Sequence, residues 1–170
     1  MVEKEVKEEA SKAGKAIKTK IIANDWTKNF DAKTHEKMYE EHLKALDISI
    51  LINNVGMAQA GNFVDTTEEE IHNTITCNIY STALMTNRVI QTFKRRYEAN
   101  PKLHSLLINT SAMAAIVPVP IVGVYSATKI FGDFLNSGLA YELSGYNVDC
   151  STWRAAGVST KIIGKDPNEK

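Results

Sequence analysis

The chain has 170 residues and a mass of 18.8 kDa, enough for one domain of ordinary size. Its 20 basic and 20 acidic residues give a formal net charge of zero, which argues against a nucleic-acid-binding protein, because such proteins carry a basic excess. A hydrophobic content of 44% excludes a disordered chain, and two cysteines are too few for a disulfide scaffold. The longest apolar run, 112–124, is too short for a bilayer-spanning helix, so no membrane segment is expected in this chain.

The N-terminal quarter is rich in charge and predicts two polar helices around one short strand. Helix-forming residues with charges of both signs fill 3–16, and Asp31 is a suitable N-cap for a second helix over 31–45. The histidines of that helix are interpreted as solvated rather than metal-binding, so no metal site is expected. Between the two helices, the stretch 17–24 predicts a strand that ends at Asp25.

A long helix is predicted over 67–99. Thr67 can cap its N-terminus, and the three glutamates that follow suit the positive end of the helix dipole. Apolar residues recur every four positions along this helix and predict a stripe that faces the core, formed by Ile71, Ile75, Ile79 and Ala83.

Apolar runs alternate with helices over the rest of the chain. The run 48–52 is typical of a strand buried on both faces of a parallel sheet. After the long helix, a strand over 105–108, a helix over 126–144 and a strand over 148–153 follow. This alternation predicts an α/β fold with a doubly wound, Rossmann-like parallel sheet and right-handed crossovers.

Tyr125 and Lys129 form the first group of residues that suggests chemistry. Residues four apart lie on one face of a helix, so the ammonium can approach the phenol and lower its pKa. Such a tyrosine can protonate a carbonyl oxygen while a cofactor delivers hydride to the carbon. Lys129 is the only charged residue in 103–132, and burial of a lone lysine is costly without a purpose. The alternative is a lysine that extends to solvent from a helix start.

Two further groups lie where a ligand site is expected. Asn53-Asn54-Val55-Gly56 directly follows a predicted strand, and ligands of open parallel sheets bind at the carboxyl ends of strands. Glycine permits close approach of a ligand to the backbone, and asparagine amides can brace neighbouring strands. Asn78 lies inside the long helix, where asparagine is a weak helix former. An ordinary turn and a satisfied polar residue are the alternatives.

Together these residues resemble the short-chain dehydrogenase/reductase family. The resemblance is carried, in order, by Asn53–Gly56, Asn78 and the Tyr-x-x-x-Lys of Tyr125 and Lys129. In detail the chain is similar to the branch of very-long-chain 3-oxoacyl-CoA reductases and 17-beta-hydroxysteroid dehydrogenases, over roughly 15–161. The resemblance implies reduction of a 3-oxoacyl-CoA or a 17-keto steroid with NADPH favoured over NAD. It also implies a possible homodimer and placement at the endoplasmic reticulum by an anchor outside this chain, or otherwise in the cytoplasm.

The resemblance also implies roles for single residues. Tyr125 would donate the proton, Lys129 would lower its pKa and hold the nicotinamide ribose, and Asn78 would support a proton-relay water. On the cofactor side, Asp25 would touch the adenine. The adenosine side would be lined by Asn53, Asn54, Val55 and Gly56, and the carboxamide would meet the turn with Val158 and Thr160.

The chain departs from the family pattern at the position of the substrate-orienting serine. That position, 13 residues before the tyrosine, holds Ala112. Ser111 is adjacent, but neighbouring residues of a strand face opposite sides, so a bulge would be needed to present it. Ser111 is therefore a displaced candidate for the catalytic serine.

The second departure is the absence of a Gly-x-x-x-Gly-x-Gly turn from the sequence. Such a turn holds the pyrophosphate at a helix N-terminus. Residues 1–170 are therefore expected to form a single, partial NAD(P)-binding domain that lacks the first two strands and the last strand of the fold. Two hypotheses follow: a partial sequence of a ketone reductase with little activity alone, or a catalytically dead relative that acts as a binding or dimerisation partner.

Overall fold

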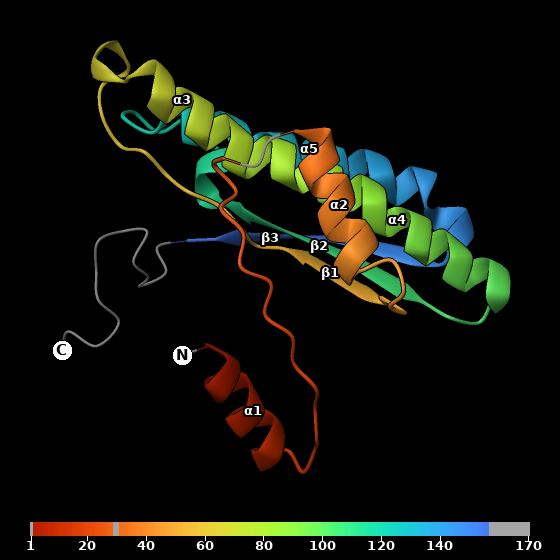
Figure 1. Cartoon of the computed structure of the whole chain (residues 1–170). Helices are drawn as coiled ribbons and strands as arrows, with labels where there is room; N and C mark the ends of the chain where they lie inside the picture. Colours follow the sequence, from red (N-terminus) through yellow and green to blue (C-terminus); the bar gives the residue numbers. More distant parts are fainter. Residues whose placement is uncertain (1, 29–30, 157–170) are drawn as a thin grey trace.

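The structure is a computed structural model that describes residues 2–28 and 31–156 (Figure 1). Its sheet consists of β1 (Ile50–Asn53), β2 (Ser105–Ala112) and β3 (Val148–Ala155), in the order β1-β2-β3. Both pairings are parallel, with Ile50 opposite Leu106 and Ser105 opposite Val148. A helical segment follows each of the first two strands, as parallel neighbours require. The expectation of an α/β fold with a parallel sheet is therefore confirmed.

The helices that cover the sheet lie on one of its faces (Figure 1). They are α2 (Ala32–His42), α3 (Glu68–Ile75), α4 (Ser81–Ala99) and α5 (Gly123–Glu142), with a π-helical segment, η2 (Thr76–Tyr80), between α3 and α4. The helix α1 (Val2–Lys12) lies apart from this layer. Short 3-10 turns occur at η1 (Phe63–Asp65), η3 (Met113–Ala115) and η4 (Ser144–Tyr146). None of the helices in the described part of the chain has the length and apolarity needed to span a bilayer.

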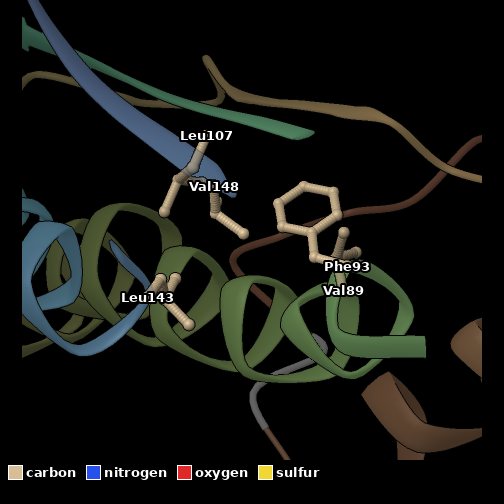
Figure 2. Close-up of a cluster of buried hydrophobic side chains, with 5 residues drawn as sticks. All are labelled: Val89, Phe93, Leu107, Leu143 and Val148. Atoms are coloured by element: carbon tan, nitrogen blue, oxygen red, sulfur yellow. The ribbon is translucent and has the colours of Figure 1, made fainter. Parts of the chain in front are cut away.

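The hydrophobic core lies between α4 and the middle of the sheet. Val89 and Phe93 of α4 pack against Leu107 and Val148 of the strands, and Leu143 closes the cluster at the end of α5 (Figure 2). Phe93 is only 1% exposed and Leu107 is fully buried. This cluster fixes α4 to β2, and thereby fixes the strand whose carboxyl end carries the candidate site.

The predicted strand over 17–24 is wrong. The described residues from 15 to 25 follow an irregular path, and Ile21 is 69% exposed. A strand exists only where its backbone groups pair with a neighbour, and no strand among the described residues lies beside this stretch.

The predicted burial of both faces of β1 is also wrong. Ile50 and Ile52 are about half exposed, at 53% and 52%, whereas Asn53 is buried on the face towards the helices. The physical reason is that the helices around this strand cover one face only (Figure 1). The prediction of solvated histidines fails for His35 of α2, which is 3% exposed and lies against the Trp26 ring at 5.5 Å between centroids. His42 is not buried.

The long helix over 67–99 forms, but its expected core stripe does not face the core. Thr67 caps α3 in a capping box with Glu70, as predicted for the N-terminus. Ile75, however, is 40% exposed, because the buried face of α3, η2 and α4 is formed mainly by small polar residues. These are Thr74, Thr76, Cys77, Asn78, Ser81, Thr82, Thr86 and Thr92.

Phe93→Ala tests the position of the core. The substitution leaves a cavity between α4 and the sheet and is expected to lower the free energy of unfolding by about 3–5 kcal/mol, measured by urea denaturation. Phe134→Ala is the matched control, because the same change on α5 removes a side chain that is 73% exposed. Its effect should stay within about 0.5 kcal/mol. Equal losses for the two variants would contradict the packing shown in Figure 2.

Candidate active site

Tyr125 and Lys129 occupy the first two turns of α5, beside the carboxyl end of β2. Both side chains are half-buried, and the Lys129 ammonium lies 5.7 Å from the centroid of the Tyr125 ring. The Lys129 Nζ donates a hydrogen bond to the carbonyl oxygen of Thr110 at 3.0 Å. Lys129 therefore folds back onto the end of the strand and does not extend to solvent.

Gly56 lies directly against this ammonium. A Cβ atom at Gly56 would meet the Lys129 Nζ at 3.1 Å and the Asn78 Oδ1 at 3.5 Å. A side chain at position 56 would therefore press on the lysine ammonium, which would have to move by a few tenths of an ångström. The sequence predicted a close approach at Gly56 for a ligand, and the structure places a side chain of the same chain there.

Asn78 joins three parts of the site through its side-chain amide. Its Oδ1 accepts a hydrogen bond from the Met57 N–H, and its Nδ2 donates to the Met57 carbonyl, both at 2.9 Å. The same Nδ2 donates to the Thr128 Oγ1 at 2.8 Å, and Thr128 in turn donates to the Tyr125 carbonyl at 2.7 Å. Asn78 lies in the π-helical segment η2, a departure from α-helix geometry that is frequent at functional sites. The amide therefore links the turn after β1 to the first turn of α5.

Asn53 braces the sheet, as one of the sequence-based interpretations allowed. Its Nδ2 donates to the Asn109 Oδ1 of β2 and to the Thr86 Oγ1 of α4, both at 2.7 Å. The side chain is buried and points towards the helices, whereas Asn54 is exposed and Val55 is half-buried. Contact of Asn53, Asn54 and Val55 with a cofactor stays a prediction.

A small polar cavity lies beneath Lys129, between the ends of β1 and β2 and the helices. Its volume is about 20 Å³, which accommodates one water molecule. The lining combines the site residues with the asparagines that brace the strands: Asn53, Val55, Asn78, Thr82, Asn109, Thr110, Ser111, Thr128, Lys129 and Gly132.

The electrostatics of the site are dominated by burial. Desolvation lowers the pKa of Lys129, while the nearby Cys77 and Asp133 act in the opposite direction. Desolvation also raises the pKa of Tyr125. This is the reverse of the sequence-based expectation, which had Lys129 lowering the pKa of the phenol. The physical reason is that burial disfavours the charged phenolate, and the hydrogen bond of the Lys129 ammonium goes to the Thr110 carbonyl.

Ser111 and Ala112 lie on opposite faces of β2, and no bulge presents the serine. The pairing of β2 with β3 runs without interruption from Ser105 to Ala112. Ser111 is 3% exposed, and its hydroxyl donates to the Lys129 carbonyl at 3.4 Å. The geometry therefore gives Ser111 a place in the contact between strand and helix, and the bulge that would make it a substrate-binding serine does not form.

Asp25 reaches the site only through its charge: burial raises the pKa of the Cys77 thiol, and the Asp25 carboxylate adds to that rise. Asp25 is exposed, and its carboxylate accepts hydrogen bonds from the N–H and hydroxyl of Thr27 at 3.0 and 2.7 Å. These bonds lower the pKa of Asp25. Val158 and Thr160 lie outside the described residues.

Sequence reasoning missed two residues that organise the site. Thr110 contributes only its backbone carbonyl, so no side-chain pattern could have revealed it. Thr128 lies inside the Tyr125–Lys129 motif, and its threonine hydroxyl, which can bond in both directions, was a signal that could have been used.

The residues present fit one end of a nicotinamide dinucleotide. The half-buried ammonium of Lys129 lies beside the ring of Tyr125, at the carboxyl end of a parallel sheet. This donor set suits the hydroxyl groups of a ribose next to a reacting carbonyl. The fold is that of the doubly wound α/β class, whose ligands bind at the carboxyl ends of the strands.

The chain belongs to the short-chain dehydrogenase family, whose family model matches residues 2–170. The family comprises NAD(P)-dependent oxidoreductases, and the resemblance predicted from the motifs is confirmed.

Among curated relatives, a very-long-chain 3-oxoacyl-CoA reductase of Coccidioides immitis is 32% identical over 145 residues, covering 84% of this chain and 39% of the relative. A 17-beta-hydroxysteroid dehydrogenase type 3 of Mus musculus is 36% identical over 146 residues, covering 84% of this chain and 44% of the relative. The chain thus spans less than half the length of these proteins.

Solved structures agree with the fold. A short-chain dehydrogenase from Sphingobium yanoikuyae, solved in complex with NADPH, is 30% identical with a TM-score of 0.71, covering 91% of this chain and 57% of that one. A short-chain dehydrogenase from Streptomyces avermitilis gives a TM-score of 0.75 at 22% identity, covering 96% of this chain and 64% of that one. The three-stranded sheet is therefore part of the doubly wound fold that these neighbours share, as the sequence predicted.

Gly56→Ala tests the contact between the turn after β1 and Lys129. The new methyl group is expected to displace the ammonium from the Thr110 carbonyl, and so to shift the NMR signals of the Lys129 Nζ and Cε. The control is Gly61→Ala, because a Cβ atom at Gly61 meets nothing within 4 Å. Lys129 signals that are equally unaffected in both variants would show that the ammonium does not lie against Gly56.

Proposed function

We propose that this chain carries the catalytic half of a ketone reductase that uses NADPH. The observation that supports this most is the placement of Tyr125 and Lys129 on the first turns of α5, with Lys129 held between Gly56 and Thr110. NADPH is favoured over NAD in this proposal because the short-chain dehydrogenase from Sphingobium yanoikuyae, which is 30% identical, was solved with NADPH. The bound cofactor would supply the hydride that reduces the carbonyl carbon.

Tyr125 is the proton donor in this proposal. A general acid must hold its proton at the working pH, and burial raises the pKa of the phenol, so Tyr125 stays protonated through the neutral range. Its place at the start of α5, beside the end of β2, leaves the hydroxyl free for a substrate oxygen, because no described hydrogen bond occupies it.

Lys129 holds the ribose and keeps a positive charge close to the phenol. An ammonium has three donor hydrogens, and one of them is used by the Thr110 carbonyl. The others are available to ribose hydroxyls. Loss of a proton from Tyr125 leaves negative charge in a half-buried site, and the neighbouring ammonium stabilises that charge.

Asn78 and the cavity beneath Lys129 provide the route by which Tyr125 regains its proton. The cavity accommodates one water molecule and is lined by both Asn78 and Lys129. A water in this cavity would lie between the Lys129 ammonium and the side chain of Asn78. Both Nδ2 hydrogens of Asn78 are donated, to Met57 and Thr128, so the amide holds the walls of the cavity in place. Its Oδ1 accepts from Met57 and can accept a second hydrogen bond from a water.

The substrate class follows from the relatives. The matched proteins are named as 3-oxoacyl-CoA reductases and 17-beta-hydroxysteroid dehydrogenases, so the proposed substrate is a ketone on a long acyl chain or a steroid. Placement at the endoplasmic reticulum, pairing as a homodimer, and the interpretation of 1–170 as one partial cofactor-binding domain belong to this same proposal.

A second candidate function is that of a binding or dimerisation partner without catalysis. The observation that favours it is Ala112 at the position of the family's substrate-orienting serine, with Ser111 turned away into the contact between strand and helix. The two candidates differ in whether a ketone is reduced at all.

Tyr125→Phe distinguishes them. Reduction of a long-chain 3-oxoacyl-CoA, followed by loss of NADPH absorbance, is expected to fall by about 10²–10⁴-fold, because the proton donor is removed. Tyr141→Phe is the matched control: it is the same change on the same helix, at a side chain that is 86% exposed. Activity that survives Tyr125→Phe would reject the proposed role, and no turnover by the unaltered chain would favour the binding partner.

Ala112→Ser tests the altered serine position. A hydroxyl there supplies the missing donor to the substrate oxygen and is expected to raise the rate of ketone reduction by about 10²-fold. Ser111→Ala should change the rate by less than about threefold, since its hydroxyl bonds only a backbone carbonyl at 3.4 Å and the net worth of such a bond is small. If Ser111→Ala lowers the rate of ketone reduction by a larger factor than Ala112→Ser raises it, Ser111 is the residue that binds the substrate oxygen.

A further inference from the structure

The helix that carries Tyr125 and Lys129 is attached to the sheet mainly by polar contacts. The four residues of α5 classed as buried are all polar: Ser126, Thr128, Asp133 and Asn136. Asn136 donates to the Thr152 Oγ1 of β3 at 2.9 Å, and the Gly132 carbonyl accepts from Asn109 of β2 at 3.2 Å. Directed contacts of this kind fix the position and rotation of a helix more narrowly than apolar packing does.

Asp133 is the one member of this set whose side chain can carry a charge. Its side chain is 8% exposed, and its Oδ2 accepts a hydrogen bond from the Arg154 Nε of β3 at 2.8 Å. Every other carboxylate in the ion pairs of the described residues is at least 36% exposed. The second oxygen, Oδ1, is buried without a hydrogen-bond partner. A buried carboxylate is costly without a partner, and the Arg154 guanidinium supplies that partner from β3.

We propose that Asp133, paired with Arg154, is a positioning residue: the pair ties the catalytic helix to the last described strand and sets the charge environment of Lys129. The role of the Asp133–Arg154 pair in the reaction rests on the proposed function, because the pair acts on the reaction only through Lys129. Asp133 follows Lys129 by one helical turn and lies on the same side of α5.

The groups that face Lys129 come from three elements. Tyr125 and Asp133 lie on α5, the Cys77 thiol approaches from η2, and Arg154 acts from β3 through its bond to Asp133. Among these, Asp133 and Cys77 raise the pKa of Lys129 against the lowering by burial. The Asp133 side chain thus favours the charged lysine. The positive guanidinium of Arg154, bonded to the same carboxyl group, opposes that effect.

This arrangement predicts shifts of opposite sign at Lys129. Asp133→Asn removes the anion, so the pKa of Lys129 falls. Arg154→Met leaves the carboxylate uncompensated, so the pKa of Lys129 rises. Each shift is expected to be about half a pH unit or more. The measurement is an NMR titration of the Lys129 Cε and Nζ in the lysine-labelled 170-residue chain, assigned with Lys129→Met.

Asp149→Asn is the matched control, because it makes the same change at an exposed residue of β3. It is expected to move the pKa of Lys129 by less than about 0.2. Equal shifts in Asp133→Asn and Asp149→Asn, or shifts of one sign in both Asp133→Asn and Arg154→Met, would overturn the proposal. If Arg154→Met does not fold, the double variant Asp133→Asn/Arg154→Met is expected to fold, because it removes both charges. Failure of the double variant would overturn the pairing.

The titration separates this inference from the proposed function, because it reads a proton on Lys129 and not turnover. A chain that reduces no ketone but shows the opposite shifts keeps the pair and rejects the function. A chain that reduces ketones but shows no shifts in the pKa of Lys129 keeps the proposed function and rejects the role of the pair.

Discussion

The half-buried ammonium of Lys129 is the constraint on which the rest of the site depends. A desolvated charge needs partners, and Lys129 finds one in the Thr110 carbonyl at the end of β2. On the way, the side chain lies against the turn after β1, where a Cβ atom at Gly56 would be 3.1 Å from the Nζ. The same turn is held by Asn78, whose amide also bonds Thr128. The contacts around Lys129 thus connect the end of β2, the turn after β1 and the first turn of α5.

The interior around this lysine is built from small polar residues and not from an apolar layer. The buried face of the segment from α3 to α4 is rich in threonine and serine, and the large apolar side chains of the core gather further along the sheet, around Phe93 and Leu107. Small hydroxyl residues let backbones approach closely and also satisfy buried polar groups, as Thr86 does for Asn53. The apolar cluster around Phe93 and Leu107 thus stabilises the fold, and the polar contacts around Lys129 position the residues of the candidate site.

The sequence predicted the parts of the fold that local patterns specify. The apolar runs predict strands at 48–52, 105–108 and 148–153, and the strands form at 50–53, 105–112 and 148–155. Capping chemistry predicts the cap at Thr67. The motif spacing predicts that Tyr125, Lys129 and Asn78 belong to one site, and the three residues lie together. It failed where partners decide the outcome. The stretch 17–24 has no neighbouring strand in the described structure, Ile75 faces outwards, and burial raises the pKa of Tyr125 while the hydrogen bond of the ammonium goes to a backbone carbonyl. Backbone partners leave no trace in a pattern of side chains.

Binding of NADPH to the 170-residue chain, followed by nicotinamide fluorescence, tests the central claim most directly. The account predicts saturable binding that Lys129→Met weakens by about tenfold or more, because a charge-assisted hydrogen bond is lost. Lys102→Met, which changes an exposed lysine, should leave the affinity unchanged. Binding that is equally strong in all three proteins, or no saturable binding by the unaltered chain, would contradict the claim that the Lys129 ammonium organises a cofactor site.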